Sequence, residues 1–323
     1  MAKTILYLGS GGMAGVFGGG IVTGLQEANA YKNIESVYGL SCGALNGAYF
    51  LAEQSRIGSS IYYENLINNF IILKKIPIAV YYRLKNKVMS TKNIPKKEKI
   101  STMNIDYLLS IVKGRKKLDI KKVVKGKIPL YVRVTNTQSG ETKDIDIRKS
   151  KDPLNLLKAA VSMTPMTYGV KVKDKKRITY ADGAIMNPIN LQNFPAYAEN
   201  KKIVIVLNAH FDETFWKQIK NELTCIVGGI LAKLIYPKPA FSDWATKEMR
   251  KKKEIKIAYT YSNVLVVSPP KDFGVDLLCT DPEKLLKAYN MGIEASKEIV
   301  KFMKEDVSKE EIAPEIKASS QLQ

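Results

Sequence analysis

The chain has 323 residues, of which 45% are hydrophobic and 25% are charged, as in an ordinary globular protein, and its length suffices for one large α/β domain. Three cysteines without a C-x-x-C pair argue against a disulfide framework or a zinc site and favour a reducing compartment. The net charge of +20 is unusual, and it favours polyanionic partners such as an anionic membrane, nucleic acid or an acidic substrate, unless it is only a lysine-rich solvated surface.

The first residues give no sign of a secretory signal, because Met1 to Lys3 run straight into a short apolar segment. The longest apolar stretches, 70–73 and 225–236, are too short to span a bilayer. We therefore expect a cytoplasmic protein without a transmembrane segment, whose contact with a membrane would be peripheral.

The first fifty residues alternate between strand and helix patterns. An apolar run at 4–8 predicts a buried strand, and a glycine-rich loop at 9–15 follows it. A helix is expected from Val16 to about Asn29, then a short strand that ends near Tyr38. This order predicts a three-layer α/β/α sandwich with a mainly parallel central sheet.

The rest of the chain continues the pattern after a basic stretch at 55–128, which we expect to be a helical insertion or lid. Further elements are predicted as follows: strands at 129–135, 142–147, up to 180, 203–207 and 264–267, and helices at 153–161, 216–234 and from 281. The expected layout is one domain over 1–304 and a polar tail over 305–323.

The residues Gly39-Leu40-Ser41-Cys42-Gly43 form a G-x-S-x-G pattern between a strand and a helix. A serine at such a sharp turn has strained backbone angles, and glycines two residues to either side leave it room. The turn lifts the Ser41 hydroxyl above the sheet and directs the first helical amides, including that of Cys42, towards the oxygen of a carbonyl under attack. The pattern predicts a nucleophilic serine.

A serine nucleophile needs a base, and the chain has a single histidine, His210. One solution is a triad of Ser41, His210 and an acid such as Asp182. The other is Asp182 alone, with a pKa raised by burial and a direct hydrogen bond to the serine. Gly183 would let the chain turn tightly after Asp182. The residues by themselves leave both solutions open.

The glycine loop is also ambiguous. Gly9-x-Gly11-x-x-Ala14 fits a dinucleotide-binding fingerprint, but the second strand does not end in the acid that such a site uses for the ribose. Alternatively, the amides of Gly11, Gly12 and Met13 surround an oxyanion beside Ser41, because adjacent βα loops of a parallel sheet open onto one edge.

The order of glycine loop, serine elbow and a distant Asp182-Gly183-Ala184 resembles the patatin-like phospholipases. The elbow fits the family's G-x-S-x-G, Asp182 begins its D-G-[GA], and Gly11, Gly12 and Gly15 fit its G-G-G-x-[RK]-G. Two residues depart from the last motif. Ser10 replaces a glycine, and Ala14 replaces Arg or Lys, which puts the anchoring of the loop in doubt.

The resemblance implies an α/β/α lipid acyl hydrolase with a catalytic dyad of Ser41 and Asp182. Gly11, Gly12, Met13 and Cys42 would form the oxyanion hole, with Gly39, Gly43, Gly15 and Gly183 supporting the turns. Phospholipid or another acyl-ester lipid is the expected substrate, with no metal, organic cofactor or nucleic acid. A Ser–Asp–His esterase, a nucleotide-binding oxidoreductase and a basic binding protein with a degraded site remain the alternatives.

Overall fold

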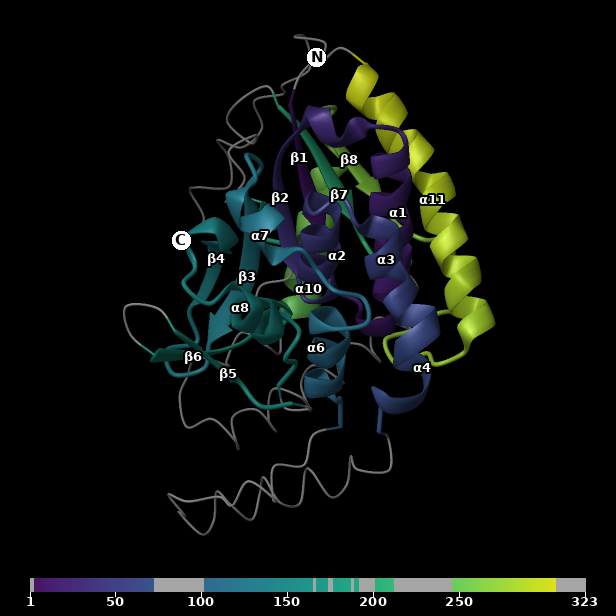
Figure 1. Ribbon diagram of the computed structural model, residues 1–323. Coiled ribbons are helices and arrows are strands. Elements are labelled where there is room, and N and C mark those ends of the chain that lie inside the picture. The colour runs from purple at the N-terminus through teal and green to yellow at the C-terminus, as the bar shows by residue number, and fades with distance from the viewer. Residues whose placement is uncertain are drawn as a thin grey trace.

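A mixed eight-stranded sheet forms the centre of the described part of the protein (Figure 1). The computed structural model describes residues 3–72, 102–164, 167–173, 177–186, 189–191, 201–211 and 246–305. Within these ranges the strands are β1 (Thr4–Leu8), β2 (Ile34–Leu40), β3 (Leu130–Asn136), β4 (Thr142–Asp146), β5 (Val170–Lys173), β6 (Arg177–Asp182), β7 (Lys202–Val206) and β8 (Val264–Val267).

Five of these strands form the parallel part of the sheet, in the order β3-β2-β1-β7-β8. The remaining strands, β4, β5 and β6, pair antiparallel at the β3 side. The mainly parallel sheet expected from the apolar runs is therefore confirmed, and so is the hairpin through Ser139 and Gly140 that joins β3 to β4.

Helices cover both faces of the sheet (Figure 1). The helices are α1 (Val16–Glu27), α2 (Cys42–Leu51), α3 (Ser55–Ser60), α4 (Leu66–Asn69), α6 (Ile105–Lys113), α7 (Ile120–Lys125), α8 (Pro153–Ala160), α10 (Lys247–Ala258) and α11 (Pro282–Lys304). A π-helical turn, Ile61–Asn65, links α3 to α4, and short 3₁₀ turns occur at Gly12–Gly15, Ala30–Asn33, Ile147–Lys149 and Gly183–Ile185.

Because side chains alternate in direction along each strand, the buried residues form two clusters, one on each face of the sheet. Leu6 and Val204 belong to the cluster that includes α1, α2 and α11, whereas their neighbours Tyr7 and Ile205 belong to the cluster that includes α10. Successive residues of a strand face opposite sides of a sheet, so both faces of the central strands are buried. This is the expected three-layer arrangement.

The two edges of β3 explain how the sheet brings distant residues together. β4 runs along one edge of β3. Along the other edge, β2 pairs with β3 as far as Arg133, and β6 pairs from Val134 onwards. Because β2 runs parallel to β3 and β6 runs antiparallel to it, the last residues of the two strands, Leu40 and Asp182, meet on that edge.

The described parts of the basic stretch at 55–128 are mostly helical, with an isolated β-bridge between Ile71 and Met103, and the apolar residues Ile61, Leu66 and Phe70 are buried. The helix expected at 216–234, part of that stretch (73–101) and nearly all of the expected tail lie outside the described residues. The single-domain layout over 1–304 remains a prediction.

Candidate active site

Ser41 lies at the junction of β2 and α2 with φ of 55° and ψ of −126°, a strained conformation for a residue that carries a side chain. A Cβ atom at Gly39 would lie 2.5 Å from the Ala44 Cα, and one at Gly43 would lie 2.1 Å from the Leu8 carbonyl oxygen. Both positions therefore need glycine because the chain passes so close. The turn has the geometry of a nucleophile elbow.

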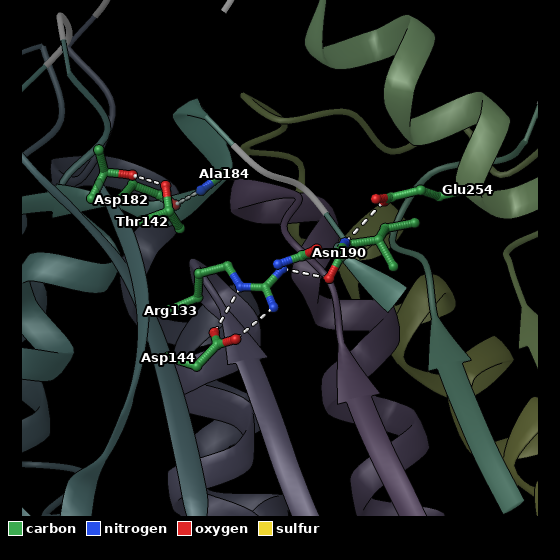
Figure 2. Close-up of polar contacts among 9 residues, drawn as sticks. Arg133, Thr142, Asp144, Asp182, Ala184, Asn190 and Glu254 are labelled. Carbon is green, nitrogen blue, oxygen red and sulfur yellow. Dashed lines mark hydrogen bonds and ion pairs between the residues drawn. The ribbon is translucent and has the colours of Figure 1, made fainter. Parts of the chain in front are cut away.

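Asp182 ends β6 and is 1% exposed. Its carboxylate accepts a hydrogen bond from the backbone N–H of Ala184 at 2.9 Å (Figure 2). The Ser41 side chain lies near enough to interact with the same carboxylate. Burial raises the pKa of Asp182 to about 6, although the interactions with Ser41, Ala184 and Lys247 oppose the rise. The group is thus mostly ionised at neutral pH and more basic than an exposed aspartate.

One of the expected oxyanion donors, Met13, has a backbone partner in the glycine loop's observed conformation. The Met13 N–H donates to the Leu277 carbonyl oxygen at 3.1 Å, so this amide already has a backbone partner and cannot also serve an oxyanion in this conformation. The Gly12 backbone amide lies near the Cys42 thiol and acts to lower its pKa. The assignment of oxyanion donors stays a prediction, in which Gly11, Gly12 and Cys42 are the candidates and Met13 would have to give up its bond to Leu277.

Cys42 follows Ser41 at the start of α2, where the first amides of a helix have no partner within the helix. Burial, and then the charge of Asp182, raises the pKa of the Cys42 thiol to about 12. The thiol is therefore protonated at neutral pH and does not compete with Ser41 as a nucleophile.

Side chains of α2 and the π-helical turn hold the far end of the glycine loop. Asn46 donates through Nδ2 to the Gly15 carbonyl oxygen at 2.8 Å and accepts from the Tyr62 hydroxyl at 3.1 Å. A Cβ atom at Gly15 would lie 2.4 Å from the Cys42 sulfur, so the loop passes directly against the elbow. Ala14, at the position where the sequence motif has Arg or Lys, is buried in the core.

The segment after Asp182 is held by buried charges that sequence reasoning missed. Figure 2 shows the Arg133 guanidinium beside Asp144. Its Nη1 donates to the Ile189 carbonyl oxygen. Arg133 Nε and Nη2 bond the Asp144 carboxylate oxygens at 2.7 and 2.8 Å. A Cβ atom at Gly183 would lie 2.5 Å from the Arg133 Cγ, so this side chain lies against the turn that follows Asp182.

Helix α10 holds the same segment from the other side. Arg250 donates to the Met186 carbonyl oxygen at 2.6 Å, and Glu254 accepts from the Asn190 N–H at 2.9 Å (Figure 2). A signal for Arg133 exists in the sequence, since it is a lone charge inside an apolar strand and such a charge is seldom buried without a partner. No comparable signal marks Arg250 or Glu254 within the basic helix.

An apolar pocket opens beside Ser41. It has an empty volume of about 500 Å³, open solvent at its mouth included, and Gly12 and Ser41 line it at the site. Its apolar wall comes from α2, the π-helical turn, α4, α6 and neighbouring segments: Leu45, Ile61, Leu66, Phe70, Met103 and Leu108. The apolar lining of this pocket suits contact with a hydrocarbon chain.

His210 lies just after β7, where its Nδ1 contacts the Pro269 carbonyl oxygen at 3.0 Å. Among the described residues, no group of three or more His, Cys, Asp or Glu side chains has an arrangement that could hold a metal ion. Within the same ranges, no helix combines the length and apolar character that crossing a bilayer requires.

The comparison with known families is decisive for the class of protein. The sequence profile described as patatin-like phospholipase matches residues 6–194, a span that contains the glycine loop, Ser41 and Asp182. The chain belongs to the patatin-like phospholipase family. The family resemblance expected from the three motifs is thereby confirmed, and patatin-like phospholipases are lipid acyl hydrolases as a class.

Two solved structures of the patatin fold resemble this patatin-like chain. VipD from Legionella pneumophila has a TM-score of 0.50 and 13% sequence identity, over 93% of this chain and 67% of VipD. The type III effector ExoU has a TM-score of 0.38 and 11% identity, over 94% of this chain and 54% of ExoU. At such identities the likeness concerns the fold. A search of curated protein sequences found no significant match.

Proposed function

We propose that this protein hydrolyses carboxylic ester bonds of phospholipids or lysophospholipids and releases fatty acid, with Ser41 as the nucleophile and Asp182 as its base. The observation that carries the proposal is the buried Asp182 carboxylate within interaction range of Ser41, which stands at a nucleophile elbow. A base works best when its pKa lies near the working pH, and burial moves the pKa of Asp182 to about 6.

In the first half of the reaction, Asp182 takes the proton of Ser41 as the serine oxygen attacks the ester carbonyl carbon. In this scheme the tetrahedral oxyanion is held by the amides of Gly11, Gly12 and Cys42, which belong to two adjacent loops. Asp182 then gives the proton to the leaving alcohol, which leaves an acyl group on Ser41. In the second half, Asp182 activates a water molecule that releases the fatty acid.

The pocket beside Ser41 supports an acyl chain as the group that the enzyme binds. Its wall is mostly apolar, and it begins at the nucleophile. A fatty acyl chain in this pocket would bring its ester carbonyl to Ser41, and each buried methylene group would contribute about 0.8 kcal/mol to binding.

The high positive charge of the chain supports the idea that the enzyme binds its substrate at an anionic membrane surface. Exposed lysines of α10, including Lys253 and Lys256, share a helix face with the exposed side chain of Met249, and the helix begins at Lys247, whose charge acts on Asp182. Cations beside an exposed apolar side chain suit an interface of acidic lipid headgroups and acyl chains.

Labelling with a fluorophosphonate probe, beside hydrolysis of phospholipid and lysophospholipid, tests the proposal. We expect Ser41→Ala to abolish both labelling and turnover, and Asp182→Asn to slow turnover by roughly 10²- to 10⁴-fold, as for the loss of a general base. Ser110→Ala, at an exposed serine on α6, is the matched control and should change neither.

The same experiment separates the proposal from its alternatives. His210→Ala should keep its turnover under the dyad mechanism, whereas a triad would lose most of it. Labelling that persists in Ser41→Ala, or a wild-type protein that neither reacts with the probe nor cleaves any lipid ester, would contradict the proposed function.

A further inference from the structure

Asn208 is a buried amide at the edge of the sheet where the candidate site lies. It follows β7, is 2% exposed, and lies outside the span that matches the family profile. Its Nδ2 donates to the carbonyl oxygens of Gly9 at 2.8 Å and Ser10 at 3.3 Å. Its Oδ1 accepts from the Gly18 N–H at 2.9 Å. One side chain thus joins the start of the glycine loop to the first turn of α1.

The Asn208 side chain is packed tightly between Gly11 and Gly18. A Cβ atom at Gly11 would lie 2.7 Å from the Asn208 Cβ, and one at Gly18 would lie 2.8 Å from its Oδ1. The Nδ2 also lies 3.9 Å from the Cys42 sulfur, beside the elbow. Asn208 therefore fits between the glycine loop, α1 and the start of α2.

The bond to Ser10 controls the direction of a candidate oxyanion donor. The carbonyl of Ser10 and the N–H of Gly11 belong to the same planar trans peptide, in which the two groups point in opposite directions. Fixing the Ser10 carbonyl towards Asn208 therefore fixes the Gly11 N–H away from it. The hydrogen bond to the Gly9 carbonyl fixes the orientation of the preceding peptide, between Gly9 and Ser10, in the same way.

We propose that Asn208 is a positioning residue of the oxyanion hole, which acts by orienting the peptide between Ser10 and Gly11. The inference rests on the proposed function, because it assigns Gly11 as an oxyanion donor. Asn208 is not a catalytic residue in this scheme. Its effect falls on the tetrahedral intermediate and not on the bound ester, so it changes kcat and leaves KM nearly constant.

Asn208→Asp tests the proposal, because the aspartate keeps an acceptor for Gly18 and removes both N–H donors. The matched control is Asn263→Asp. Asn263 makes a similar bond, through Nδ2 to the Lys201 carbonyl oxygen at 2.8 Å, at the opposite end of β7. Gly18→Ala is a second, uncharged variant, since its Cβ would push the Asn208 Oδ1 away while alanine suits the helix.

We expect Asn208→Asp and Gly18→Ala to lower kcat on a fatty acyl ester on the order of 10- to 100-fold, with KM changed less than about threefold, below the loss seen when an oxyanion donor itself is removed. Asn263→Asp should keep wild-type kcat. Thermal unfolding of all variants separates this effect from a general loss of stability. Equal kcat values in the Asn208 and Asn263 variants, or a rise in KM that accounts for the whole loss, would overturn the proposal.

Amide hydrogen exchange keeps the proposal testable if the proposed function fails. Exchange of the peptide covering Ser10 to Gly15 should be faster in Asn208→Asp than in Asn263→Asp, whether or not the protein cleaves a lipid. If wild type and Ser41→Ala are equally inactive, the proposed function is wrong, and unchanged exchange in this peptide would in addition refute the orienting role of Asn208.

Discussion

At the scale of single residues, the site combines two unfavourable states that support each other. Ser41 is held at a positive φ, and Asp182 is a carboxylate removed from water. The interactions of Asp182 with Ser41 and with the N–H of Ala184 favour the ionised form, yet burial still raises the pKa of Asp182 to about 6. Such costs are common where a protein positions reactive groups in advance.

The raised pKa predicts how stability depends on pH. An unfolded aspartate has a pKa of about 3.9, so between this value and 6 the folded protein binds a proton that the unfolded chain releases. Stability from this group is therefore present below about pH 4 and lost as the pH rises through 6, up to about 3 kcal/mol for two pKa units.

Asp182→Asn should remove the loss of folding stability at high pH, because the amide is neutral and keeps an oxygen for the Ala184 N–H. We expect the variant to be more stable than wild type by about 1 to 3 kcal/mol at pH 8 and nearly equal to it at pH 4, as measured by urea unfolding. An advantage of the same size at both pH values would contradict a buried, ionised Asp182.

Sequence reasoning reached the residues whose role is encoded locally and missed those whose role depends on distant contacts. Ser41 and Asp182 stand in short motifs, so their identity as candidates needed no fold. The Met13 N–H has a partner, the Leu277 carbonyl, that is far away in the sequence, so no local pattern could indicate this bond. Asn208 was visible only as a polar residue after a strand, and nothing local showed that its amide reaches the glycine loop.

At the scale of elements, the segment after Asp182 is held from two sides. Arg133 of β3, itself paired with Asp144 of β4, donates to its Ile189 carbonyl, and α10 holds Met186 and Asn190. α10 lies beyond the span that matches the family profile. A helix outside that span therefore fixes the segment that follows the candidate base.

Removing the α10 contact should loosen the aspartate without unfolding the protein. We expect Glu254→Ala to lower kcat about tenfold, because the Asn190 N–H loses a charged acceptor and such bonds contribute about 1.5 to 3 kcal/mol. Glu254→Gln keeps an acceptor and should be milder. Lys253→Ala, on the exposed side of the same helix, is the control in steady-state kinetics, and a kcat equal to that of Glu254→Ala would refute the role of α10.

The pocket beside Ser41 leads to a prediction about helix α6, which forms part of its wall. Leu108 of α6 lines its apolar wall and is 4% exposed, so Leu108→Trp should fill part of the space that a long acyl chain would use. We expect kcat/KM for a 16-carbon ester to fall at least about tenfold relative to an 8-carbon ester, since each lost methylene contact is worth about 0.8 kcal/mol.

Ser110→Trp, on the exposed side of α6, should leave this ratio of chain lengths unchanged. A Leu108→Trp variant that loses activity on both esters equally would show that the pocket does not bind the acyl chain. Overpacking of the core, which costs typically 1 to 3 kcal/mol, is monitored by the thermal unfolding of both variants.

At the scale of the whole molecule, the charge of +20 predicts electrostatic attraction to acidic lipid. Binding to vesicles should rise with the fraction of anionic lipid and fall between about 0.05 and 0.5 M salt, because the Debye length shrinks from more than 10 Å to less than 8 Å. Cosedimentation measures both trends, with neutral vesicles as the control. Binding that is indifferent to lipid charge and salt would rule out this use of the charge.

The parts of the architecture that could be predicted from sequence are those that a short apolar run or a turn residue indicates by itself. The run at 4–8 and the Ser139–Gly140 turn gave β1 and the β3–β4 hairpin correctly. The position of β6 was not predictable in this way, because it depends on β2 ending at Leu40 and leaving the edge of β3 open beyond Arg133. Pairing between strands so far apart in sequence has no local signal.

The position of β7 in the sheet determines how far the chain can be truncated. β1 pairs with β2 on one side and with β7 on the other, and β7 follows the region that carries the family motifs. A fragment cut after those motifs would leave β1 as a bare edge, with unpaired amides and carbonyls next to uncovered hydrophobic side chains. Such a fragment would tend to aggregate, so the smallest useful recombinant piece has to reach past the motifs and retain β7, β8 and the closing helix α11.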